Sequence, residues 1–111
     1  MASKKEIEFC KAIEDGDIEK VKRFIKSGID IDCEIYEGSF ELCLRGEKGF
    51  SPLMIATTWD DVEMLKLLID SGAYIEQTDD RTQTVIDYAE INDAENCLSY
   101  LTELISKKEN E

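Results

Sequence analysis

The 111-residue chain contains no histidine, and this absence restricts the chemistry that its other polar side chains could perform. A serine or cysteine nucleophile would have no imidazole base beside it. The glycines form no phosphate-binding loop. The carboxylates fall on predicted exposed helix faces and loops, where no pocket would tune one of them for acid–base catalysis. The sequence therefore predicts a protein that is not an enzyme, with no catalytic residue and no cofactor.

Four cysteines are the next candidates for chemistry: Cys10, Cys33, Cys43 and Cys97. None of them forms a C-x-x-C pair, and histidine is absent, so we expect no zinc site. Cys10 and Cys97 fall on apolar faces of predicted helices, where cysteine packs as a small hydrophobic residue. The first residues, MASKKEIEF, contain lysines but no apolar segment behind them, so we expect no signal peptide. We therefore expect a cytoplasmic protein whose thiols are reduced.

One group of carboxylates has the spacing of a calcium loop. Asp30, Asp32, Glu34 and Glu41 occupy positions 1, 3, 5 and 12 of that pattern. Position 6 is Ile35, however, whereas the loop needs glycine for its sharp turn, and no helix clearly follows. We therefore expect no metal site.

The formal net charge of −13 is large for a chain of this length. Residues 51–111 contain 14 acidic and 4 basic side chains and so hold −10 of that charge. Such a field repels nucleic acid and anionic lipid and favours a basic protein partner. The alternative is that the acidic surface is simply well solvated and binds no partner. No apolar run reaches the roughly 18 residues that a membrane span needs.

The sequence predicts that short helices, arranged in pairs, hold the polar side chains discussed above. The first pair is predicted at residues 5–14 and 18–27, with Gly16 between the helices and Gly28 after them. In the second pair, Ser51 is a good N-cap, with Pro52 at the first helical position. The residues expected to cap or end the remaining helices are Asp60 or Asp61, Gly72, Thr84 and Asp93.

The stretch SPLMIA, followed by LKLLIDSGAYIE, resembles the ankyrin repeat, whose signature includes a T-P-L-H-x-A run and a period of about 33 residues. Ala56 and Ala89 lie 33 residues apart and fit this period, whereas Ala12 and Ala56 lie 44 residues apart. The resemblance covers about residues 5–105 and implies an all-α repeat solenoid in one domain, 1–111. The expected parts are unit one (about 5–32), an insertion (about 33–48), unit two (about 49–78), a capping unit three (about 79–106) and a short polar tail (107–111).

The insertion alternates apolar and polar residues on both sides of Gly38-Ser39. A Gly-Ser pair between two such runs predicts a β-hairpin over residues 31–45 with a type II′ turn. In that register Ile35 opposes Leu42 and Cys33 opposes Leu44. An isolated hairpin is marginal in water, so its apolar face must dock either on the first helices of its own stack or on a partner.

By resemblance, ankyrin-like stacks bind proteins through loop tips and the exposed side of the first helices, which form a concave face. Trp59 and Phe50 are candidate anchors because large aromatic residues dominate interfaces. The alternatives are that Trp59 packs under the hairpin and that Phe50 packs at the edge of the core. The full set of candidate partner-binding residues is Tyr36, Glu47, Lys48, Phe50, Thr58, Trp59, Asp60, Asp79, Asp80, Arg81, Gln83 and Asn92.

The sequence thus predicts a monomeric protein–protein interaction module with a basic protein partner, and no nucleic-acid or membrane partner. A narrower hypothesis is an immunity protein or inhibitor that masks the positive cleft of a basic toxin. A further alternative is a structural role, with self-association through the hairpin.

Overall fold

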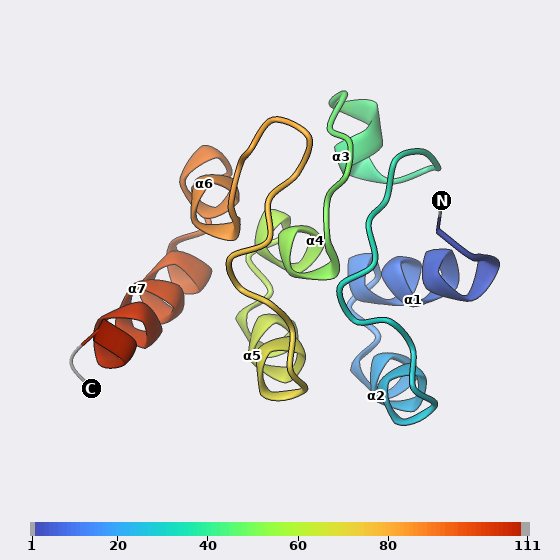
Figure 1. Cartoon of the computed structure of the whole chain (residues 1–111), viewed down its shortest axis with the longest axis horizontal. Coiled ribbons are helices and arrows are strands. Elements are labelled where there is room, and N and C mark those ends of the chain that lie inside the picture. Colours follow the sequence, from blue (N-terminus) through green and yellow to red (C-terminus); the bar gives the residue numbers. More distant parts are fainter. Residues whose placement is uncertain (1, 110–111) are drawn as a thin grey trace.

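The structure, a computed structural model, describes residues 2–109. The elements are α1 (Lys4–Glu14), α2 (Ile18–Lys26), α3 (Glu41–Leu44), α4 (Pro52–Thr58), α5 (Val62–Asp70), α6 (Val85–Ile91) and α7 (Glu95–Glu109). Apart from the short α3, the helices form two rows, with α1, α4 and α6 in one and α2, α5 and α7 in the other (Figure 1). Helix α4 packs against α1 and α6, and each pair α1/α2, α4/α5 and α6/α7 packs together. None of the helices in the described range is long and apolar enough to cross a membrane.

We call the row of α1, α4 and α6 the inner row and the row of α2, α5 and α7 the outer row. Side-chain caps fix the starts of the inner helices α4 and α6. Ser51 accepts a hydrogen bond from the N–H of Met54, and Pro52 stands at the first helical position, as the sequence predicts. Thr84 caps α6 in the same way, by accepting from the N–H of Asp87. Each cap satisfies one of the backbone donors that a helix start leaves free, which is why these helices begin where they do.

The second row follows the same rule in α2 and α5, but not in α7. Asp17 caps α2 and Asp61 caps α5. Asp93, the expected cap of the last helix, lies one residue too early, because its φ of 52° places it in the left-handed turn before α7. Ala94 stands at the cap position instead, and its side chain has no acceptor. The helix then continues through residues 107–109, part of the expected tail, whereas 110–111 lie outside the described residues.

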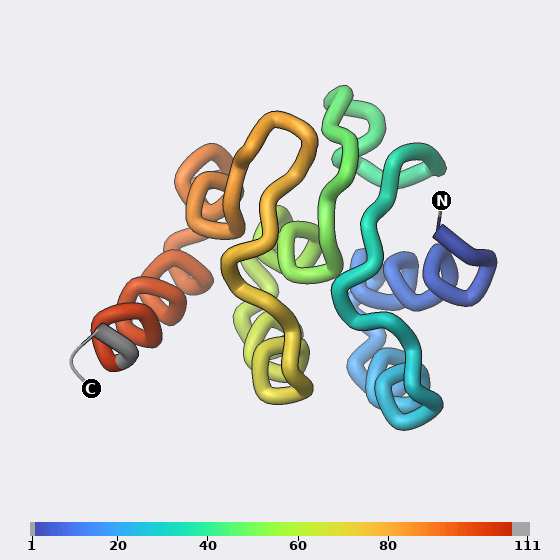
Figure 2. The backbone as a smooth tube through the Cα atoms, in the orientation of Figure 1, coloured from blue at the N-terminus to red at the C-terminus, as the bar shows by residue number. Residues whose placement is uncertain are grey.

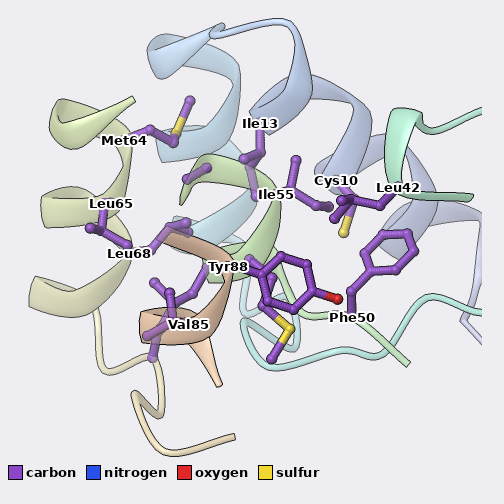
Figure 3. Packing of buried hydrophobic residues seen from close by; sticks show 14 of the residues in the cluster. Cys10, Ile13, Leu42, Phe50, Ile55, Met64, Leu65, Leu68, Val85 and Tyr88 are labelled. Carbon is purple, nitrogen blue, oxygen red and sulfur yellow. The ribbon is translucent and has the colours of Figure 1, made fainter. Parts of the chain in front are cut away.

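A continuous core lies between and within the two rows. Val21, Leu65, Leu68 and Leu101, which the helical periodicity predicts as core, are each 0% exposed. Figure 3 shows side chains from α1, α4, α5 and α6 meeting in one cluster. Because each helix pair buries its apolar face only against its neighbours, the stack is stable as a whole rather than unit by unit.

The predicted β-hairpin is wrong, because residues 2–109 contain no strand. Ile35 forms one isolated antiparallel bridge with Phe50: the Ile35 N–H donates to the Phe50 carbonyl at 2.9 Å. After the bend at Gly38, residues 41–44 form the short helix α3 rather than a second strand. Figure 2 shows this path between the end of α2 and the start of α4.

The physical reason lies in how the insertion buries its apolar residues. Phe40 and Leu42 are buried, and the Phe40 ring packs edge-on against Phe50 with centroids 5.9 Å apart. A helical turn lets these two side chains reach the core while the turn bonds its own backbone, whereas a lone hairpin is marginal. Leu44, predicted on the same apolar face, is instead 80% exposed. The Glu41 N–H donates to a Glu14 carboxylate oxygen at 3.0 Å, which ties the insertion to α1.

Candidate functional site

The loops before α4 and α6 meet through a buried polar network. The Tyr88 hydroxyl donates to Asp79 Oδ2 at 2.6 Å and lies 3.3 Å from Glu47 Oε2. Asp79 also accepts from the backbone N–H groups of Arg81 and Gln83, each at 2.9 Å. Burial and the nearby carboxylates raise the pKa of Tyr88, which keeps its proton available for donation. These contacts hold the loops in place.

Asp79, Glu47 and Gln83, three of the expected partner-binding residues, therefore have structural roles. Asp79 is only 5% exposed. The carboxylate of Glu47 lies 3.5 Å from the Arg81 guanidinium as well as close to Tyr88. The two loops are also joined through their backbones, because the N–H of Asp80 donates to the Lys48 carbonyl at 3.0 Å.

The exposed part of this loop surface carries an aromatic ring among acidic groups. Tyr36 is 43% exposed, and its hydroxyl donates to Glu34 Oε2 at 2.7 Å. The hydrogen bond to Glu34 is the main cause that raises the pKa of Tyr36 to about 12, with a smaller contribution from Asp80. Lys48 and Asp80 are exposed on the adjoining loops. The expected residues Tyr36, Lys48, Asp80 and Arg81 thus remain accessible.

Beside Tyr36 lies an acidic groove of about 420 Å³. Its lining comes from the N-terminal end of the chain, from the last residues of unit one and from the start of the insertion: Ala2, Glu6, Asp30, Asp32, Cys33, Glu34 and Tyr36. Apart from Tyr36, these residues are absent from the sequence-based set of binding residues. The signal that could have found part of this lining is the run of Asp30, Asp32 and Glu34 at every second position just before Tyr36. No group of side chains within residues 2–109 has the arrangement of a metal site.

The ends of the inner helices supply a second part of the expected surface. Trp59 follows α4 and is 51% exposed, so it is not buried beneath the insertion. Asn92 follows α6, where its amide donates to the Tyr88 carbonyl at 2.8 Å and its oxygen accepts from Arg45 of the insertion. The Thr58 hydroxyl donates back to the Met54 carbonyl at 2.7 Å.

Two expected contact residues have roles within the fold. Phe50 is 0% exposed, which agrees with core packing and removes it as an anchor. Asp60 is engaged by the next repeat, because the Cys97 N–H and the Asn96 amide donate to its carboxylate at 2.9 and 2.8 Å. Partial burial alone would raise the pKa of Asp60, but these hydrogen bonds outweigh it and lower the pKa.

Comparisons with known proteins agree on one family. The family described as "Ankyrin repeats (3 copies)" matches residues 9–110. A putative ankyrin repeat protein of Rickettsia bellii is 40% identical over 87 residues, which cover 78% of this chain. An ankyrin repeat, SAM and basic leucine zipper domain-containing protein of Rhinolophus ferrumequinum is 38% identical over 65 residues, or 59% of this chain. In each case the match spans only 11% of the relative's length.

A solved structure extends the comparison to three dimensions. It is the complex of a predatory endopeptidase from Bdellovibrio bacteriovorus with an immunity protein. One of its chains matches with a TM-score of 0.68 and 25% sequence identity. The match covers 93% of this chain and 47% of that chain.

Proposed function

The chain belongs to the ankyrin-repeat family, and from that premise we propose that it is a non-enzymatic module that binds a basic segment of a protein partner. Repeats of this kind present loop tips and inner helices along one extended surface, which suits contact with another protein. The proposal places the centre of that contact at Tyr36 and the acidic groove beside it. The four cysteines are free thiols, which supports a reducing, cytoplasmic setting.

The acidic groove is the observation that carries the proposal. Glu6, Asp30, Asp32 and Glu34 converge on it, and Tyr36 forms part of its wall. A lysine or arginine side chain could lie over the exposed Tyr36 ring while its cationic group pairs with a carboxylate. Electrostatic attraction from a chain of net charge −13 would also speed the encounter with a basic partner.

Trp59 supplies an apolar contact that charge alone would not provide. It is the single tryptophan of the sequence, and half of its surface is open to solvent. A partner that covers Trp59 would bury a large aromatic surface, the kind of contact that usually dominates interface energetics. Asp80, Arg81, Lys48 and Asn92 complete the proposed surface as its polar rim.

The test is binding of a fluorescein-labelled peptide of alternating Lys-Arg pairs and leucines, measured by anisotropy over a salt series. Any basic peptide is attracted by the net negative charge of the chain, so the comparison must separate contacts in the groove from this general attraction. Glu34→Lys changes the groove, and Asp70→Lys makes the same change of charge on the outer helix α5. We expect Glu34→Lys and Tyr36→Ala to weaken binding several-fold more than Asp70→Lys. Equal effects of Glu34→Lys and Asp70→Lys would refute the groove as the site.

A second candidate is inhibition of a basic enzyme. The similarity to a chain from the complex of an endopeptidase with an immunity protein favours this candidate over a general scaffold. An inhibitor would copurify with one enzyme and abolish its activity at a one-to-one ratio, whereas a scaffold would leave the activity unchanged. Self-association through a hairpin loses its basis, because residues 31–45 form no hairpin.

A further inference from the structure

A groove lined by α1 and α2 is positively charged, whereas the chain as a whole has a formal net charge of −13. It encloses about 420 Å³ and is lined by Lys5, Lys20, Arg23, Phe24 and Ser27. Three lining residues of α2 and its C-cap Ser27 are spaced i, i+3, i+4 and i+7, so they lie along one face of that helix. Phe24 is half-buried, with its ring 5.8 Å from the Phe9 ring, and provides an apolar wall.

The three cations of this groove are not explained by internal ion pairs. Among the described residues, the salt bridges join Lys11, Arg45, Arg81 and Lys107 to carboxylates, and none involves Lys5, Lys20 or Arg23. Glu8 and Glu19, acidic residues of the same two helices, are exposed, and neither forms a salt bridge with these cations in the described part of the chain. The positive charges therefore remain open to a ligand.

Helix stability does not explain them either. Arg23 lies in the last turn of α2, where a cation interacts favourably with the helix dipole. Lys5 and Lys20, however, lie in the first turns of α1 and α2, where a positive charge is unfavourable. Two of the three cations thus stand where the local structure gains nothing from them.

We propose that this groove binds a short acidic segment of a partner protein, with one apolar side chain of the segment against Phe24. The lining face of α2 is about 10 Å long, which matches about three residues of an extended chain. Carboxylates on either side of the apolar residue would pair with Lys5, Lys20 and Arg23. The remaining charge of the molecule disfavours a long polyanion such as nucleic acid, whose phosphates would reach the acidic surface beyond the groove.

The experiment measures anisotropy of a fluorescein-labelled peptide, Glu-Asp-Glu-Phe-Glu-Asp-Glu, with the full chain. We expect saturable binding that weakens with salt and with replacement of the peptide's phenylalanine by serine. Lys20→Glu and Arg23→Glu should each weaken binding by about tenfold or more, and Arg23→Lys should retain most of it. The matched control is Lys22→Glu, an exposed residue of α2 outside the groove, which should change affinity far less.

Several results would overturn this inference. The first is no saturable binding by the unchanged chain, and the second is an equal loss in Lys22→Glu and Arg23→Glu. Tighter binding of a single-stranded oligonucleotide would assign the groove to another ligand class. Concentration-dependent dimers in sedimentation that disappear in Arg23→Glu would assign it to a second copy of the chain. Because the proposed basic-partner surface uses Tyr36 and Glu34, variants of those residues test the two proposals separately.

Discussion

The carboxylate of Asp60 caps a helix of the next repeat, because its Oδ1 accepts a hydrogen bond from the Cys97 N–H at 2.9 Å. Cys97 is the third residue of α7, the position whose N–H a local cap normally satisfies. The local position holds Ala94, which has no acceptor, so the cap comes from the turn between α4 and α5. The hydrogen bond therefore couples the second repeat to the third.

Removal of this cap should destabilise the chain. Asp60→Gly preserves the positive φ of 51°, which glycine adopts freely, but removes the acceptor. We expect a loss of about 0.5–2 kcal/mol in the free energy of unfolding, measured by urea denaturation. The amide proton of Cys97 should also exchange faster. Asp60→Asn is the control, since asparagine tolerates this φ and keeps an acceptor oxygen, so it should retain most of the stability.

Local signals in the sequence were sufficient for most helix boundaries. Ser51 and Thr84 predict the starts of the helices that follow them, since an N-cap side chain accepts a hydrogen bond from a backbone N–H only two or three positions away. The Asp60–Cys97 contact gave no such signal, because it joins residues 37 positions apart. The sequence therefore predicts Asp60 on a partner surface and Asp93 as the cap of the last helix, whereas Asp60 performs that capping role.

The β-hairpin predicted for the insertion is wrong for a different reason. Phe40, Leu42 and Leu44 alternate with polar residues, and a segment this short fits one helical turn as well as a strand. Tertiary packing favours the helical turn over the strand, because Phe40 packs on Phe50 and Leu42 is buried, while Leu44 remains exposed to solvent. The burial of Phe50 depends on the same packing.

Two leucines provide a matched test of the core. Leu68 is 0% exposed on α5, whereas Leu44 is 80% exposed on α3. Leu68→Ala should lower the free energy of unfolding by about 2–5 kcal/mol, because it leaves a cavity among buried side chains. Leu44→Ala should change it by less than about 0.5 kcal/mol. Thermal and urea denaturation measure both, and similar effects of the two substitutions would contradict the assigned helix faces.

The insertion should behave as part of the folded core. Leu42 is 2% exposed, so Leu42→Asp would place a carboxylate in an apolar site without a partner. We expect a strong loss of thermal stability, whereas Glu37→Gln on the exposed bend should have little effect. Hydrogen exchange gives an independent readout: the amides of Ile35 and Leu44, which donate to backbone carbonyls, should be protected. Unprotected amides together with unchanged stability in Leu42→Asp would mean that the insertion is a flexible loop.

The polar network at Tyr88 should make the fold sensitive to alkaline pH. Burial and the Asp79 carboxylate raise the pKa of Tyr88 in the folded chain, whereas in the unfolded chain it returns to about 10. A folded-state pKa above the unfolded one gives stability that is fully present below about pH 10 and is lost as the pH rises above it.

Tyr88→Phe removes this titration and leaves Asp79 and Glu47 without a hydroxyl donor. The substitution should therefore lower stability by about 1–3 kcal/mol at neutral pH. The difference between the variant and the unchanged chain should then shrink above about pH 10. Urea denaturation at several pH values measures both, and a difference that stayed constant across this range would show that Tyr88 does not carry the alkaline sensitivity.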